Sequence, residues 1–207
     1  MSFDTIATDE SIASTIAHLK ERNVEGVRVD TGSDALTLIQ TLIPDGASVM
    51  NGSSTTLQQI GYIDLLKSGS HPWKNLHDAI VEESDPTRQK ELRRQALLSD
   101  FYLGSVHALA ETGEYVIASN TASQLPHVVY SSPNLIFVVG AQKITASLTD
   151  ALRRLEEYVV PLEDARMKEV YGPTAGTQLS KTLIVRNESP FVGRSVRMII
   201  VKEKLGF

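Results

Sequence analysis

The sequence predicts an α/β fold, with an open, mostly parallel sheet that carries helices on both faces. In the first half of the chain, segments with helical spacing of apolar residues alternate with short extended apolar segments, which is typical of a parallel sheet covered by helices. Residues 135–140 (LIFVVG) form the most hydrophobic run and indicate a central strand that is covered on both faces. The chain has 207 residues and no linker-like stretch, so we expect a single domain over residues 1–207.

The first four elements follow from their caps and their apolar spacing. Thr8 offers a helix cap, and Ile12, Ile16 and Leu19 form an apolar stripe behind it. In chain order we expect a helix over residues 8–23, a strand over 26–30, a helix over 33–43 that Ser33 or Asp34 caps, and a strand over 47–50.

The middle of the chain is less regular. Apolar residues at helical spacing predict a helix over 57–66, whereas residues 67–86 lose clear periodicity and indicate a small lobe or a functional loop. Asp85 and Pro86 then open a surface helix over 87–99, which we expect to pack on the sheet.

The last part of the chain is mainly extended. Thr112 and Gly113 predict a tight hairpin turn between two strands, although the preceding alanines also allow one helical turn. The other expected elements are strands over 101–105 and 115–119, a helix over 148–158, and a late pair of strands over 182–185 and 196–201.

Composition excludes several classes of function. The absence of cysteine excludes disulfides, thiolate zinc sites and iron–sulfur clusters. The net charge of −5 is spread along the chain, so nucleic acid is not an expected partner. No apolar run is long enough for a membrane span and no leader is recognisable, so we expect a cytoplasmic protein with no membrane partner. His71 and His77 have no helical metal spacing, and we expect neither a metal nor a cofactor.

A polar segment after the strand over 47–50 has the composition of an anion site. It contains Asn51, Gly52, Ser53, Ser54 and Thr55, and it opens the helix over 57–66. Backbone N–H groups and hydroxyls at a helix start bind phosphate or carboxylate. Alternatively, Ser53 or Ser54 only caps the helix and Gly52 only serves a tight turn. We expect the first five residues of this segment to contact a small anionic ligand.

Three segments taken together resemble the LUD domain family, whose name comes from lactate utilisation proteins. They are residues 51–61, residues 100–113 and the ending 193–207. The resemblance implies a fold similar to that of ribose-5-phosphate isomerase, glucosamine-6-phosphate deaminase and coenzyme A transferases, in which a loop after an early strand holds anionic groups. It also implies a homo-oligomer and a link to the use of lactate or other organic acids. Some relatives carry a C-terminal set of cysteines, and residues 171–178 here contain none.

The resemblance also makes Glu111 a candidate catalytic residue. In coenzyme A transferases a Glu followed two residues later by Gly acts as the nucleophile, and Glu111 has this relation to Gly113. If the segment is extended, Ser105, His107 and Glu111 share one side of it; if it is helical, His107 and Glu111 are still neighbours. We therefore take Glu111 and His107 as the catalytic candidates, with Gly104 and Ser105 beside the ligand. The alternative is that Glu111 only stabilises a hairpin corner.

A second polar segment is a candidate wall of the ligand site. Asn120 and Thr121 offer hydrogen bonds, and His127 is a candidate ligand-binding base. An ordinary capped turn is an equal alternative. Lys143 follows the central strand and would meet an anion there, but a solvent-facing lysine is the default expectation.

Two functions remain open from the sequence. The first is a protein that binds a small anionic metabolite, namely an organic acid, a phosphorylated compound or an acyl coenzyme A. The second is an enzyme of the acyl or coenzyme A transferase type, or of the isomerase type, that uses Glu111 and His107.

Overall fold

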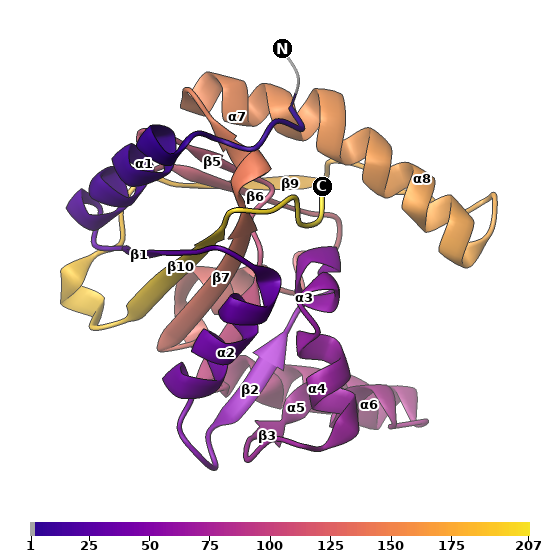
Figure 1. Cartoon of the computed structure of the whole chain (residues 1–207). Coiled ribbons are helices and arrows are strands. Elements are labelled where there is room, and N and C mark those ends of the chain that lie inside the picture. Colours follow the sequence, from indigo (N-terminus) through magenta and orange to yellow (C-terminus); the bar gives the residue numbers. More distant parts are fainter. Residues whose placement is uncertain (1–2) are drawn as a thin grey trace.

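Six strands form a main sheet in which every neighbouring pair is parallel (Figure 1). The computed structural model describes residues 3–207. The strands of the main sheet, in spatial order, are β1 (Glu25–Val29), β10 (Ser195–Val201), β7 (Asn134–Gly140), β4 (Phe101–Gly104), β2 (Ser48–Asn51) and β3 (Lys74–Asn75). The predicted parallel α/β sheet is confirmed, and the hydrophobic run at 135–140 lies in its interior as β7.

A second, mixed sheet packs beside the main one. Its strands, in spatial order, are β8 (Ile144–Thr145), β5 (Ala108–Ala110), β6 (Tyr115–Ser119) and β9 (Lys181–Val185). β5 and β6 form the predicted hairpin, and Gly113 adopts φ 93° in its turn. Both late strands are present but do not pair with each other, because β9 joins β6 whereas β10 lies between β1 and β7.

Thirteen helical segments join and cover these strands within residues 3–207. The α-helices are α1 (Asp9–Glu21), α2 (Gly32–Leu42), α3 (Thr55–Gln59), α4 (Tyr62–Ser68), α5 (Leu76–Val81), α6 (Pro86–Gln95), α7 (Leu148–Arg154) and α8 (Val160–Tyr171). Shorter 3₁₀ or π turns are η1 (Ala96–Leu98), η2 (His127–Ser131), η3 (Ala141–Lys143), η4 (Leu155–Val159) and η5 (Pro190–Val192).

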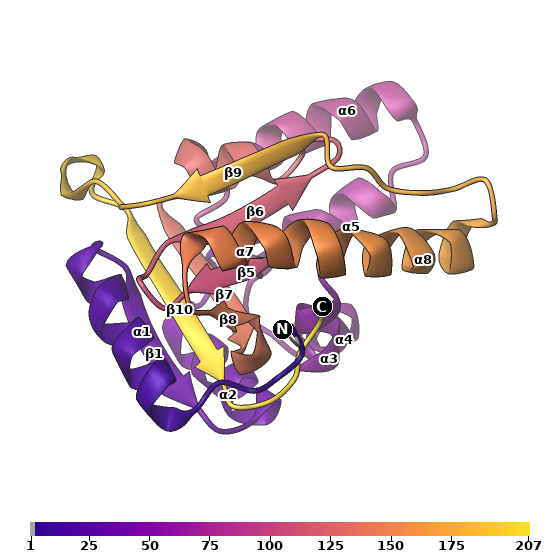
Figure 2. The same cartoon turned by 90° about the horizontal axis from the view of Figure 1, so that it is seen from above.

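The buried side chains show how the layers stack. Successive residues of β7 alternate between two cores: Phe137 packs with α1 and the second sheet, whereas Val138 packs with α2 and α4. A third core joins the second sheet to α7 and η4 through Ala108 and Leu155. Figure 2 shows α7, η4 and α8 running in line over the second sheet. Both faces of the main sheet are therefore covered, one by helices and the other by α1 with the second sheet.

Some element boundaries differ from the prediction. Thr31, not Ser33 or Asp34, caps α2, while Asp34 completes a capping box with Thr31. The single helix expected over 57–66 is two short helices, because Gly61 adopts φ 81° between α3 and α4. Ser54 does cap α3, through a hydrogen bond from the backbone N–H of Leu57.

The irregular segment 67–86 contributes to the sheet. β3 extends the main sheet beside β2, and α5 follows it directly. The helix that follows, α6, buries none of its residues, so the expectation that it packs on the sheet is wrong; it contacts α5 and η1 instead.

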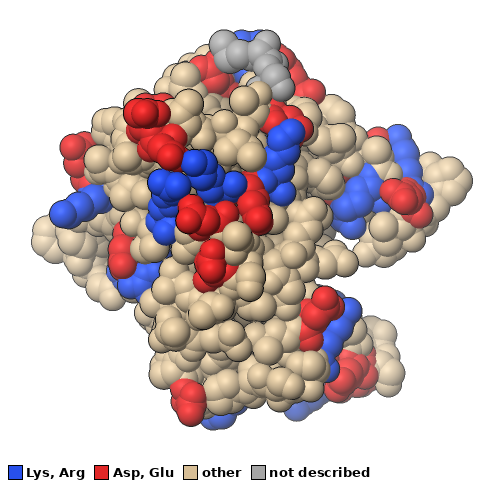
Figure 3. Space-filling view, in the orientation of Figure 1, with Lys and Arg blue, Asp and Glu red and all other residues tan. Residues whose placement is uncertain are grey.

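The surface in Figure 3 carries Lys, Arg, Asp and Glu side by side, without a large area of one sign on this face. Within residues 3–207, no helix combines the length and the apolarity that crossing a bilayer requires.

Candidate functional site

Three adjacent strands of the main sheet end at one place. β2 ends at Asn51, β4 at Gly104 and β7 at Gly140, and the three strands are neighbours in the order β7, β4, β2. In open parallel sheets, ligands bind outside the carboxyl ends of the strands. The segments that follow these strands therefore form the natural place for a ligand site.

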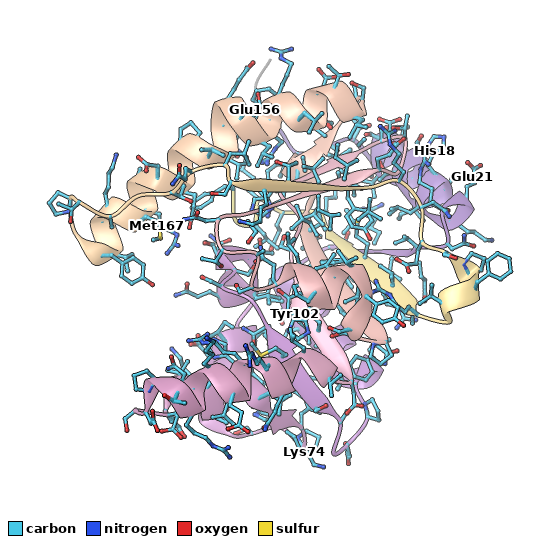
Figure 4. The ribbon with its side chains drawn as sticks, turned by 180° about the vertical axis from the view of Figure 1, so that it is seen from behind. His18, Glu21, Lys74, Tyr102, Glu156 and Met167 are labelled. Carbon is cyan, nitrogen blue, oxygen red and sulfur yellow. The ribbon has the colours of Figure 1, made fainter. Side chains whose placement is uncertain are left out.

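A cavity of about 500 Å³ occupies this place. Its floor is made by the segments after β2 and β4, by Lys143 and by residues 206–207, and its far wall by η4 and α8. Figure 3 shows the hollow between the protruding α8 and the part of the molecule below it, which contains α4, α5 and α6. Figure 4 shows Met167 on α8 and Tyr102 on β4, and both residues line the cavity. The volume is in the range of small-molecule sites.

Lys143 lies at the floor of the cavity. Its side chain is 3% exposed, and its Nζ lies 3.0 Å from Thr56 Oγ1, 3.0 Å from Ser105 Oγ and 3.3 Å from the carbonyl oxygen of Val106. No carboxylate within residues 3–207 forms an ion pair with it. The expectation of a solvent-facing lysine is therefore wrong.

The chain's crossing between sheets explains this position. β4 leads to β5, and β7 leads through η3 to β8, so both connections pass from the main sheet to the second sheet. β5 and β8 pair in parallel, which brings the two connections side by side. Lys143 lies in one connection and bonds Ser105 and Val106 of the other.

Burial, and to a smaller extent the positive charge of Arg154, together lower the pKa of Lys143 to about 7. Arg154 is itself fully buried; it donates to the carbonyl oxygens of His107 and Phe3 and lies over the Tyr158 ring. Two buried cations thus lie near the cavity, and within residues 3–207 neither forms an ion pair with a carboxylate, so the site favours an incoming negative charge.

His107 lines the cavity but is a neutral imidazole at neutral pH, so it does not act there as an imidazolium acid. Its Nδ1 accepts a hydrogen bond from the backbone N–H of Ala118 at 3.1 Å. Desolvation, followed by the charges of Lys143 and Arg154, holds the pKa of His107 well below its usual value. The neutral ring therefore carries its proton on Nε2.

Most of the predicted anion loop lines the cavity. Gly52, Ser53, Ser54 and Thr55 all do so, whereas Asn51 is buried beneath them with no hydrogen-bond partner for its Oδ1. The helix that these residues open, α3, has only five residues. It is too short to supply the N-terminal field that the sequence suggested, so the positive charge at this site comes from Lys143.

The second polar segment forms a wall and is also an ordered turn. Asn120 and Thr121 line the cavity, and their contact with a ligand stays a prediction. The hydroxyl of Ser119 donates to Gln124 Oε1 at 2.8 Å and accepts from the backbone N–H of Ala122, which adopts φ 64°. Both interpretations of this segment thus describe it: an internally bonded turn that faces the cavity.

Two predicted residues lie outside the cavity lining. His127 is buried and stacks on Tyr102, with its Nδ1 2.9 Å from Ser132 Oγ, and burial lowers its pKa to about 4. Glu111 lines a separate, smaller cavity, where it accepts a hydrogen bond from Ser11 Oγ at 2.7 Å. The predicted grouping of Ser105, His107 and Glu111 on one side is therefore wrong, because residues 105–111 do not form one continuous strand. Ser105 and His107 lie in the connection before β5, whereas Glu111 follows β5 and bonds Ser11 of α1.

The part of the far wall that α8 forms, which we call the outer wall, was not expected from the sequence. Glu163 and Arg166 of α8 line the cavity and form a two-bonded ion pair, with 2.7 Å in each bond. Met167, Tyr171 and residues 177–179 complete this wall. α8 has no buried residue, so its spacing carried no signal of packing against a site. Across residues 3–207, no cluster of three or more His, Cys, Asp or Glu side chains has a geometry that would hold a metal ion.

Comparison with known proteins agrees with this architecture. The family model described as LUD domain matches residues 12–181. The crystal structure of a DUF162 family protein from Deinococcus radiodurans is similar with a TM-score of 0.54; the alignment has 10% identity and covers 95% of this chain and 98% of that one. At this identity the likeness shows the fold alone. No curated protein matches the chain.

Proposed function

The chain belongs to the LUD domain family, and from this premise we propose that it binds a small anionic metabolite in the cavity above Lys143. The ligand classes that fit are an organic acid, a phosphorylated compound and an acyl coenzyme A. The family name puts lactate and related organic acids among the first ligands to test.

One observation carries the proposal: Lys143 is buried at the cavity floor and has only neutral partners. A buried ammonium without a counterion is costly, and the cost falls when an anion binds beside it. Because the pKa of Lys143 is about 7, both its protonated and its neutral form are populated around neutral pH. An anion would raise this pKa and draw in a proton.

Neighbouring groups supply directional bonds for such a ligand. The hydroxyls of Thr56 and Ser105 accept from Lys143 Nζ, and each donates its proton in a long bond to a backbone carbonyl, 3.3 Å to Leu205 and 3.4 Å to Val106. Each O–H can rotate from that carbonyl to an anionic oxygen. Ser53 and Thr55 bring further hydroxyls to the same floor. Apolar side chains, including Ile117 and Val159, line the deeper part, so the body of the ligand need not be charged throughout.

The transferase-like or isomerase-like alternative lacks such support. It requires Glu111 beside His107, but Glu111 faces Ser11 in a different cavity. Because His107 is neutral, it does not supply an imidazolium as a general acid for this chemistry. We therefore place the binding function first.

The test is a calorimetric titration at pH 6.5 with inorganic phosphate, L-lactate, ribose 5-phosphate and acetyl coenzyme A. At least one of them should bind, and its affinity should fall as pH rises above about 7, because Lys143 loses its proton there. The Lys143→Met variant should lose binding at least tenfold. Lys90→Met, an exposed lysine on α6, is the matched control and should bind as the unmodified protein does.

Two results would contradict the proposal. One is the absence of binding for all four compounds at millimolar concentration. The other is equal affinity in the Lys143→Met and Lys90→Met variants, which would mean that the anion binds elsewhere. The homo-oligomer implied by the family resemblance stays a prediction, which sedimentation equilibrium would test.

A further inference from the structure

The contact between Ser105 and Lys143 has the geometry of a nucleophile with its base. Ser105 Oγ lies 3.0 Å from Lys143 Nζ, both side chains line the cavity, and Ser105 comes directly after the last residue of β4. We propose that Ser105 attacks acyl esters or thioesters in this cavity and that Lys143 is the general base that accepts its proton.

The surroundings of the pair fit this role. A lysine serves as a base only when its amine is unprotonated, and burial together with the charge of Arg154 brings Lys143 into that range near neutral pH. Thr56 Oγ1, 3.0 Å from the same nitrogen, holds the amine in place from the other side. A nucleophile, a base within hydrogen-bond reach and a group that orients the base are the three parts that covalent catalysis requires.

The reaction balances without any further cofactor. In the first step Ser105 Oγ bonds to the acyl carbon, its proton passes to Lys143 Nζ, and the alcohol or thiol leaves with that proton. In the second step a water attacks the acyl-serine, Lys143 takes a proton from this water, and the proton returns to Ser105 Oγ as the carboxylic acid departs.

The lining of the cavity indicates the substrate class. Beside the polar floor, apolar side chains of η4 and the two sheets accommodate a short acyl chain. These side chains are Ile117, Val128, Phe137, Leu155 and Val159. We assign a short-chain acyl ester or thioester as the substrate. That its leaving group carries a negative charge is the one part of this assignment that rests on the proposed function.

The test uses an alkyl fluorophosphonate, which forms a bond from the serine oxygen to phosphorus and releases fluoride. Mass spectrometry of the unmodified protein should place one label on Ser105, and hydrolysis of p-nitrophenyl butyrate should accompany it. Ser105→Ala should abolish both. The matched control is Ser123→Ala, whose hydroxyl also lines the cavity but bonds Thr121 instead of an amine, and it should react normally.

The base is tested by the pH dependence of labelling. The rate should rise about tenfold per pH unit below pH 7 and level off above it, and Lys143→Met should lower it at least a hundredfold. The other ionisable groups around the amine do not titrate between pH 6 and 8.5: the pKa of His107 lies below this range, the pKa of Arg154 is about 10, and burial raises that of Tyr102. Glu163 and Arg166 face the cavity from α8, and the Glu163→Gln variant should keep the same profile.

The outcomes separate this inference from the proposed function. Anion binding that depends on Lys143, without any label on Ser105, overturns the inference and leaves the binding proposal standing. Labelling of Ser105 without anion binding does the reverse. A labelling rate that does not change between pH 6 and 8.5 overturns the role of Lys143 as the base, even if Lys143→Met fails to fold.

Discussion

The floor and the outer wall of the cavity are built in different ways. The floor comes from the ends of three central strands, and its groups are buried and bonded on several sides, as Lys143 is to Thr56 and Ser105. The outer wall is α8, which has no buried residue and holds Glu163 and Arg166 to each other. Chemistry that needs fixed geometry therefore belongs to the floor, whereas the wall can change its residues at little cost in stability.

The largest expected effect compares a buried residue of the cavity lining with the exposed outer wall. Leu155 of η4 lines the cavity next to α8 but, unlike α8, is fully buried in the core against the second sheet. Leu155→Ala should lower the free energy of unfolding by about 2–5 kcal/mol, because it leaves a void. Tyr171→Ala, on the 67% exposed side chain at the end of α8, should change it by less than about 0.5 kcal/mol. Urea denaturation measures both, and similar losses would contradict the comparison.

The second effect concerns pH and the floor alone. Because the pKa of Lys143 is about 7 in the folded protein and 10.5 is its ordinary value, only the unfolded chain holds the proton between these pH values. The contribution of Lys143 to the free energy of unfolding should therefore rise with pH from about 7 to about 10.5, by roughly 1 kcal/mol per pH unit, and be lowest below pH 7. Denaturant midpoints at several pH values measure it.

Lys143→Met should remove this part of the pH dependence, and Lys90→Met should retain it. A similar slope in both variants would show that the amine is solvated in solution and that the floor is more open than the structure indicates.

The smallest effect concerns the wall. The side chains of Arg166 and Glu163 are 28% and 32% exposed, so Arg166→Met should lower the free energy of unfolding by at most about 0.5 kcal/mol. It should nevertheless weaken phosphate binding about threefold, since the carboxylate of Glu163 then faces the cavity without its partner. Melting temperature and calorimetry measure the two quantities. A melting point lowered by many degrees would mean that the wall is structural.

The sequence predicted the layers of the fold better than the chemistry of the site. β7 and α1 were predictable because burial on two faces and on one face leave different apolar spacings. The position of Lys143 was not, because it depends on two connections crossing between sheets, and spacing along one segment carries no trace of that crossing. β5 separates Glu111 from His107, since the two residues flank this strand and line different cavities. The composition of residues 52–55 predicted that they line a site, and they do line the cavity. The helix that they open ends before Gly61, so it is too short to add the positive field of a long helix.

The place of β10 affects how the protein is made. Among the described strands, β1 pairs only with β10, and β10 follows all the others along the chain, yet it lies between β1 and β7. On the ribosome, the two apolar faces of β7, with Phe137 on one and Val138 on the other, are therefore fully enclosed only after residues 195–201 have been made. During that interval the nascent chain exposes unpaired strand edges, which is the condition that recruits chaperones and favours aggregation.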